Sequence, residues 1–273
     1  MNKLSEPSGV SRDQNIDILD PKSLLKFIPY KWEKELSVFV PCYNEEGNII
    51  DTFNTLTAAL LKNKFSWEII VIDDLSIDKS KELICRYIDE HPEYSIRLFA
   101  RKMNIGLAQN YIDAAFIARG KYLKLVSGDN AEHQKTLEDV FGLLGKADMI
   151  IPSYLKVEGR SFIRNLFSKT YTFIVNFLSG YRIKYYNGGA LHLTCNVLRW
   201  HTDYHGYSFQ ADIITRLLDQ GMTYIEIPGS TQERETGVSQ ALKLRNFLSV
   251  SHFFLDLAIR RLGRIYRKKS NSA

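Results

Sequence analysis

The chain has 273 residues, of which 45% are hydrophobic and 25% charged, so it can bury a sizeable core and has an ordinary globular composition. Its net charge of +5 is a modest excess that does not favour a nucleic acid as a partner. Residues 1–20 contain no apolar secretory segment, and no apolar run reaches the roughly 20 residues that span a bilayer. The three cysteines are widely spaced and are interpreted as reduced thiols of a cytoplasmic protein.

Short apolar runs alternate with amphipathic patterns after a tail expected at residues 1–34. We expect strands at residues 36–40, 67–72, 96–100 and 122–126. We expect helices at residues 48–61, 80–91 and 109–118, the last of them closed by Gly120. Near-continuous apolar strands that alternate with helices predict an α/β fold with a mostly parallel sheet and helices on both faces.

The pattern changes after the fourth strand. The further expected elements are a helix at 135–144, a strand at 149–152, a long apolar helix at 161–178, a turn at Gly188 and Gly189, a strand at 190–193, a helix at 211–220 and a strand at 223–227. No linker interrupts these elements, so we assign one domain to residues 35–240. Residues 241–273 follow it as a basic, amphipathic helical segment.

Polar residues follow each of the first four expected strands. Ligands of such sheets bind beyond the carboxyl ends of the strands, so these residues are expected to share one site. Its candidate residues are Pro41, Tyr43, Asn44, Glu45, Asp73, Asp74, Asn104, Gly128 and Asp129.

Two acidic positions in this set carry the chemistry. Asp73 and Asp74 close a buried strand, where a carboxylate can accept hydrogen bonds from a base or a ribose; a helix cap is the alternative interpretation. Asp129 follows the fourth strand and offers the oxygen that Mg²⁺ or Mn²⁺ prefers, with phosphate oxygens completing the shell. Gly128 would let phosphates approach the backbone. A plain turn is the alternative there.

Several common site patterns are absent from the sequence. It has no glycine-rich P-loop and no G-x-G-x-x-G after the first strand, which argues against P-loop ATPases and Rossmann dehydrogenases. His201 and His205 are four residues apart, but the intervening residues indicate a loop, so no zinc site is expected. A metal and basic side chains must then neutralise any phosphates.

Two further residues are candidates for catalysis. Asp212 opens a helix and could deprotonate an acceptor hydroxyl; the alternative is an acidic residue that favours the helix dipole. Arg234 lies in a polar loop after a strand, and its planar guanidinium suits a phosphate; the alternative is a solvated surface loop.

Together these motifs resemble the family 2 glycosyltransferases of GT-A fold. The segment from Val38 to Glu46 resembles the family's opening strand and P-x-Y-N-E turn, and Val71 to Asp78 resembles its V-D-D-x-S-x-D segment, which holds the nucleoside. Asn104-Ile105-Gly106 is similar to its N-x-G. Ser127-Gly128-Asp129 stands where the family has its metal-binding D-x-D, with Ser127 in place of the first Asp.

Later motifs resemble one branch of that family. Ile227-Pro228 followed by Arg234, Gly237 and Ser239 is similar to the I-P…R-x-x-G-x-S segment of dolichyl-phosphate mannosyltransferases and other polyprenyl-phosphate glycosyltransferases, although Gln240 replaces the Lys that often follows. The resemblance implies inverting transfer of a sugar from a nucleotide sugar to a lipid phosphate, with Asp129 on the metal and Arg234 on a phosphate. Two alternatives stay open: transfer to a hydroxyl of a growing glycan, and a catalytically silent nucleotide-sugar-binding protein.

The basic C-terminal segment is expected to bear on location. Its apolar residues recur at spacings of three and four, and six cations occupy its final stretch: Arg260, Arg261, Arg264, Arg267, Lys268 and Lys269. Such a helix can lie in the headgroup region of a membrane, which predicts peripheral attachment to the cytoplasmic membrane face. The alternative is a helix packed on the catalytic domain with a solvated tail.

Overall fold

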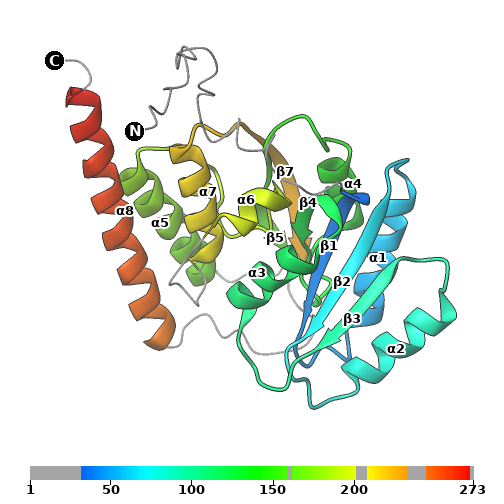
Figure 1. The fold of residues 1–273 in the computed structure, drawn as a ribbon. Helices are drawn as coiled ribbons and strands as arrows, with labels where there is room; N and C mark the ends of the chain where they lie inside the picture. The colour runs from blue at the N-terminus through cyan, green and yellow to red at the C-terminus, as the bar shows by residue number, and fades with distance from the viewer. Residues whose placement is uncertain (1–31, 159–161, 201–207, 233–243, 271–273) are drawn as a thin grey trace, which may run out of the picture. The chain divides into compact units, whose positions relative to one another are not determined.

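A computed structural model describes residues 32–158, 162–200, 208–232 and 244–270 (Figure 1). Its strands are β1 (Lys34–Cys42), β2 (Trp67–Asp73), β3 (Ile96–Ala100), β4 (Gly120–Leu125), β5 (Met149–Glu158), β6 (Leu191–Leu193) and β7 (Tyr224–Gln232). Its helices are α1 (Ile49–Leu61), α2 (Ser80–Glu90), α3 (Leu107–Ile117), α4 (Gln134–Phe141), α5 (Phe162–Ser179), α6 (Thr194–Leu198), α7 (Phe209–Asp219) and α8 (Leu244–Ser270).

The strands form one sheet in the order β3-β2-β1-β4-β6-β5-β7. β1 pairs in parallel with β2 and β4, β2 with β3, and β5 with β7. β6 is antiparallel to both of its neighbours, β4 and β5, so it alone runs against the other described strands. The mostly parallel α/β fold predicted from the sequence is confirmed.

Both faces of the central strands are buried. Phe39 of β1 and Ile70 of β2 belong to one apolar core with Tyr111 of α3 and Phe209 of α7. Val38 and Val40 alternate with Phe39 and are also fully buried, as a strand covered on both sides requires. Helix α1 packs against both α2 and α4 at that second face (Figure 1).

Three local expectations need correction. Gly120 does not close the preceding helix: it begins β4, where its N–H donates to the Ser37 hydroxyl at 2.8 Å. The five-residue helix α6 was not expected, because one turn is too short to show a helical period. β5 does not end at Pro152 but continues beyond it. Only the first residues of β5 pair with β6, and the rest of the strand pairs with β7 alone, so the N–H that Pro152 lacks can be tolerated on the unpaired side.

The C-terminal segment forms a single helix, α8, that packs against α5 (Figure 1). Phe253 and Leu257 of α8 lie in the main apolar core. The helix is therefore seated on the domain through one of its faces. Within the residues described, no helix is both long enough and apolar enough to cross a membrane.

Candidate functional site

The polar clusters predicted to share a site lie at one edge of the sheet. β1, β2, β3 and β4 are parallel neighbours, so the loops that follow them leave the sheet at the same edge. The N–H of Asp74 donates to the Cys42 carbonyl at 2.8 Å, and the N–H of Val126 donates to the Phe39 carbonyl at 3.0 Å. These bonds bring the starts of the second and fourth loops against the end of β1.

The loops after β1 and β2 are tied together by reciprocal hydrogen bonds. The N–H of Asn44 donates to the Ser76 hydroxyl at 2.9 Å, and the Asn44 side-chain carbonyl accepts the N–H of Ile77 at 2.9 Å. The Asp78 carboxylate accepts the N–H of Glu46 at 3.0 Å. The loops after β1 and β2 are therefore held together. With the loops after β3 and β4 at the same edge of the sheet, they are here called the rim.

The backbone of this edge adopts an uncommon conformation in three places. Among the described residues, the non-glycine residues with positive φ are Asn44 (57°), Leu75 (72°) and Asn130 (50°). Asn tolerates this region, whereas a bulky Leu is strained there. All three lie in loops that follow β1, β2 and β4. Backbone strain of this kind gathers at functional sites, where surrounding contacts hold it in place.

Asp73 accepts the N–H of Ser76 at 3.2 Å within its own loop, and Asp74 joins the loop after β3 to the loop after β2. The Asp74 carboxylate accepts the N–H of Ile105 and the N–H of Gly106, each at 3.0 Å. Gly106 has a φ of 88°, which a glycine adopts without strain and which presents its N–H to Asp74. The Asn104 side chain donates to the Asp74 carbonyl at 3.1 Å. Asp74 and Asn104 thus hold the β3–α3 loop against the β2–α2 loop.

The first loop supplies the accessible surface of the rim. Tyr43 is 51% exposed, which leaves its ring available to a ligand. Pro41 and Glu45 are partly buried, and the Glu45 carboxylate accepts a hydrogen bond from the Asn48 side chain at 2.9 Å. An exposed aromatic ring beside a fixed carboxylate is suited to a nucleoside.

The Asp129 loop packs directly against the same rim. A side chain at Gly128 would come within 2.6 Å of the Pro41 carbonyl, so close packing of the two loops requires the glycine there. The Thr52 hydroxyl of α1 donates to the Gly128 carbonyl at 2.9 Å and accepts the N–H of Asn130 at 2.9 Å. Asp129 is held between these contacts and is buried.

A buried ion pair that sequence inspection missed anchors the far end of this loop. The Lys124 ammonium of β4 lies 2.9 Å and 3.0 Å from the two Glu132 carboxylate oxygens, and the Tyr154 hydroxyl donates to that carboxylate at 2.7 Å. Burial lowers the pKa of Lys124, and the Glu132 carboxylate opposes that effect. A Lys within a buried strand followed by an acidic residue eight positions later was the available signal.

The Glu132 end of the loop also meets β7. Glu132 forms an isolated bridge with Thr231, and the hydroxyl of Thr136 accepts the N–H of Ser230 at 3.0 Å. Arg234 follows β7 by two residues in the chain and lies outside the described residues, as do Gly237 and Ser239. Residues His201 and His205 also lie outside them.

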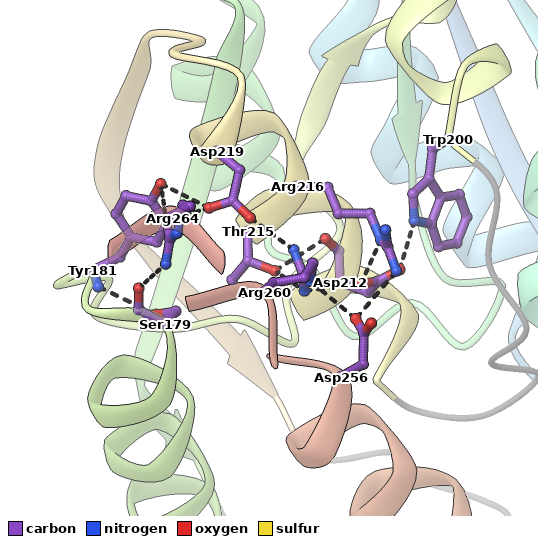
Figure 2. A network of polar contacts seen from close by, with 10 residues as sticks. All are labelled: Ser179, Tyr181, Trp200, Asp212, Thr215, Arg216, Asp219, Asp256, Arg260 and Arg264. Carbon is purple, nitrogen blue, oxygen red and sulfur yellow. Dashed lines mark hydrogen bonds and ion pairs between the residues drawn. The ribbon is translucent and has the colours of Figure 1, made fainter. Parts of the chain in front are cut away.

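Asp212 lies in a different network, between α7 and α8 (Figure 2). Its carboxylate is fully buried and accepts hydrogen bonds from Trp200 Nε1 at 2.9 Å, from Arg216 Nε at 2.9 Å and from Arg260 Nη2 at 3.2 Å. Asp256 of α8 accepts from Arg216 and Arg260 at 3.1 Å and 2.9 Å. The candidate general base is thus part of the ion pairs that join two helices.

Protonation of Asp212 is governed by that environment. Burial raises the pKa of Asp212, while the Arg216 guanidinium, the Trp200 N–H and the Arg260 guanidinium oppose the rise. A base that must accept a proton would have to release one of these donors. The geometry therefore suits a positioning role for Asp212 more than proton transfer.

The same network continues along α8. Arg264 contacts Asp219 of α7, the Tyr181 hydroxyl and the Ser179 carbonyl at the end of α5 (Figure 2). Arg260 also reaches Asp219, at 3.0 Å. Arg260 and Arg264, two of the six cations of the C-terminal segment, are consequently used inside the protein.

The residues at the rim fit a metal that is shared with a ligand. Among the described residues, no group of three or more His, Cys, Asp or Glu side chains is gathered so that it could hold an ion. A hard cation such as Mg²⁺ often takes only one or two protein carboxylates and completes its shell with water and phosphate oxygens. Asp129 lies at this edge beside the candidate nucleoside residues and can supply the one carboxylate that such a shared site needs. The described residues do not form a metal site built wholly from protein ligands.

Comparison with known proteins places these features in a family. Residues 37–201 match the family described as "Glycosyl transferase family 2". A dolichyl-phosphate beta-glucosyltransferase of Dictyostelium discoideum is 35% identical over 148 residues, covering 48% of this chain and 45% of that protein. Dolichyl-phosphate beta-glucosyltransferase ALG5A of Trichomonas vaginalis is 30% identical over 162 residues, covering 58% of this chain and 44% of that protein. The chain spans about half the length of these curated relatives.

A solved structure shares the fold. Glucosyl-3-phosphoglycerate synthase from Mycobacterium tuberculosis, in complex with Mn²⁺, uridine diphosphate and glucosyl-3-phosphoglycerate, superposes with a TM-score of 0.58 at 14% identity. The similarity covers 85% of this chain and 81% of that one. With a family match that begins in β1 and passes through the Asp73-Asp74 and Asp129 loops, this chain belongs to glycosyl transferase family 2.

Proposed function

We propose that this chain transfers a sugar, with inversion, from a nucleotide-sugar donor to a polyprenyl- or dolichyl-type lipid phosphate. The observation that carries the proposal is the strained, cross-tied rim at the ends of β1, β2 and β4, in a chain of this family. The names of two relatives, both dolichyl-phosphate beta-glucosyltransferases, support the acceptor. In this reaction an acceptor phosphate oxygen bonds to the anomeric carbon, and the bond from that carbon to the nucleotide diphosphate breaks.

The rim would bind the donor. Tyr43 would stack on the nucleoside, and Pro41, Glu45 and Asp73 would line its base and ribose; Tyr43 is exposed, Pro41 and Glu45 are partly buried, and Asp73 is buried at the end of β2. Asp74 and Asn104 would act through the β3–α3 loop that they hold, and Gly128 through its close packing on Pro41. The roles of Asp74, Asn104 and Gly128 follow from these contacts, which fix the loops that carry them.

Asp129 would hold Mg²⁺ or Mn²⁺ together with the donor diphosphate. When bound, such an ion stabilises the negative charge of the leaving diphosphate. The chain's own contribution is to fix the loop that carries Asp129, through Thr52 at one end and the Lys124–Glu132 pair at the other. Arg234, which follows β7 by two residues in the chain and lies outside the described residues, would bind a phosphate of the donor or the acceptor.

The burial and the hydrogen bonds of the Asp212 carboxylate favour a phosphate acceptor over a sugar hydroxyl. A hydroxyl needs a base, whereas an acceptor phosphate is already ionised. Because the Asp212 carboxylate is buried and accepts three donors, it is suited to fixing the start of α7 beside the acceptor. We therefore assign it a positioning role.

A lipid acceptor requires that the enzyme work at a membrane surface. We propose peripheral attachment on the cytoplasmic face. The C-terminal helix, with its apolar stripe and basic end, supports the attachment, and the free thiols of Cys42, Cys85 and Cys195 support a reducing compartment.

The proposal is tested by turnover with a panel of uridine- and guanosine-diphosphate sugars and a detergent-solubilised short-chain polyprenyl phosphate. Mass spectrometry should find a hexosyl polyprenyl phosphate and one equivalent of free nucleoside diphosphate. Transfer to a glycan hydroxyl without any to the lipid phosphate would establish the rival acceptor. Thermal stabilisation by a donor without nucleotide release under any condition would identify a silent binding protein.

A further inference from the structure

Helices α5 and α8 each carry a stripe of large apolar residues on the side that faces away from the core. The stripe on α5 is Leu166, Phe173 and Phe177, with Phe167 beside it; the stripe on α8 is Leu255, Ile259, Leu262 and Tyr266, with Ile265 beside it. These nine residues, here called the α5–α8 apolar face, are between 46% and 76% exposed. In each helix the stripe repeats at offsets that keep it on one side of the helix.

The opposite side of each helix is already committed. Val175 of α5 and Phe253 and Leu257 of α8 are buried in the core. Arg260 and Arg264 project from that same inner side of α8 and form the ion pairs with α7 (Figure 2). Neither helix can therefore rotate to bury its outward stripe, because the rotation would break the apolar packing and the ion pairs of the inner side.

The two helices also hold each other in place. The rings of Tyr171 and Phe254 lie 5.8 Å apart between them, and Arg261 of α8 donates to the Phe177 carbonyl at the end of α5. Phe173 and Phe177 stack on each other at 6.4 Å. The two helices that carry the stripes thus lie side by side and support each other (Figure 1). An exposed apolar surface of this extent is unusual for a solvated monomer and marks an interaction site.

Charge identifies the partner. Helix α5 contains no acidic residue, and the single acidic residue of α8, Asp256, is paired with Arg216 and Arg260 on the inner side. Lys169 is exposed on α5, and the α8 sequence ends with Arg267, Lys268 and Lys269. An apolar face on two helices that contain several cations, and whose one acidic residue is paired on the inner side, suits an anionic bilayer. A second copy of the chain would instead place like charges against each other, which is unfavourable.

We propose that the α5–α8 apolar face docks on an anionic lipid bilayer, with both helices lying in the headgroup region. This inference rests on the proposed function, because it supplies the surface from which a lipid-phosphate acceptor would be reached. It extends the expectation that the C-terminal segment attaches through its apolar stripe and its cations, because it adds α5 to the docking surface. Arg260 and Arg264 face inward, Arg261 donates to a carbonyl of α5, and α5 provides four of the nine exposed apolar residues.

Flotation of the full chain with phosphatidylcholine vesicles, with and without phosphatidylglycerol, tests the docking. The wild type should bind the anionic vesicles. Phe173→Ser with Phe177→Ser, and separately Leu262→Ser with Tyr266→Ser, should each weaken binding about tenfold or more, because each pair removes two large apolar groups from the contact. The matched control is Leu61→Ser with Phe116→Ser, which removes two exposed apolar residues elsewhere and should leave binding unchanged.

Several outcomes would overturn the inference. Full binding by the α5 variant would leave α8 as the sole anchor, and full binding by both variants would exclude the face. A wild type that is dimeric by sedimentation, and variants that become monomeric without any vesicle binding, would show that a second copy covers it. Turnover on a detergent-solubilised acceptor separates the two proposals: activity without vesicle binding removes the docking alone, and vesicle binding without activity removes the proposed function alone.

Discussion

The rim at the ends of β1, β2 and β4 and the junction between α7 and α8 are both rich in polar groups, but they use them differently. At the rim, backbone N–H groups and short side chains tie the loops together, and Tyr43 stays exposed. At the junction, the charged groups themselves make the ties, and the Asp212 carboxylate is fully buried. At the rim, bonds between backbone N–H groups and short side chains hold the loops and leave the Tyr43 ring accessible to a ligand. At the junction, the charged side chains are already paired with one another.

Lys124 offers the strongest way to break the rim. Lys124→Met would leave the Glu132 carboxylate buried without its counter-charge, so the free energy of unfolding should fall by about 3–5 kcal/mol in urea denaturation. Lys124→Met with Glu132→Gln should recover most of that loss, because Gln is neutral and still accepts the Tyr154 hydroxyl. A loss below about 1 kcal/mol in the single variant would contradict the anchoring role.

Asp129→Asn tests the metal-binding role of the Asp129 carboxylate, because it removes the charge and keeps the shape of the side chain. Loss of the carboxylate should cost about 3 kcal/mol of transition-state stabilisation, which is roughly a 100-fold fall in kcat. Mn²⁺ affinity measured by electron paramagnetic resonance in the presence of nucleoside diphosphate should fall in parallel. Asp51→Asn, at an exposed site on α1, is the control. Full wild-type activity in excess chelator would refute the metal assignment.

Asp212→Asn tests the junction. The change leaves Arg216 and Arg260 without their shared carboxylate charge, so stability should fall by about 1.5–3 kcal/mol. With a lipid-phosphate acceptor, kcat should change less than tenfold. A fall of about 10²–10⁴-fold at unchanged stability would instead show that Asp212 is a general base and would favour a hydroxyl acceptor.

Asp78 gives the smallest effect and concerns pH. Burial opposes ionisation of Asp78, but hydrogen bonds from Ser80 and from the Glu46 N–H outweigh it and lower the pKa of the carboxyl below 3.8. A lowered folded-state pKa contributes stability above the unfolded pKa, and that stability is lost as the pH falls through the folded pKa. Asp78→Asn should therefore cost about 1 kcal/mol at neutral pH and less in strong acid. An equal loss at both would contradict the assignment, with Asp51→Asn as the control.

The alternation of apolar strands and amphipathic helices was enough to predict the sheet and most of its elements. Burial on both faces leaves a direct trace in sequence, as in residues 36–40, because every position of such a strand must be apolar or satisfied. Short or interrupted elements left no such trace. α6 has one turn, and Pro152 looked like the end of a strand that in fact continues beside β7.

For the candidate site, too, one part could be predicted from the sequence and another part could not. The residue types and their positions after strands indicated the rim, because parallel strands bring their carboxyl ends to one edge whatever the details of packing. Tertiary structure alone decided which of the candidate side chains remain available to a ligand, both at the rim and at the junction between α7 and α8. Asp74 is used to hold the Asn104 loop, Gly128 to fit against Pro41, and Asp212 to bind arginines.

The sequence by itself determined the fold class, the edge at which the candidate site lies and the amphipathic character of α8, because these depend on local periodicity and on the order of elements. Only the tertiary structure decided the partners of each charge. Arg260 and Asp212 are 48 residues apart in the chain, as are many residues that never meet. Their contact depends on how α8 packs on α7, and that packing is set by apolar contacts across the whole core, which no local pattern encodes.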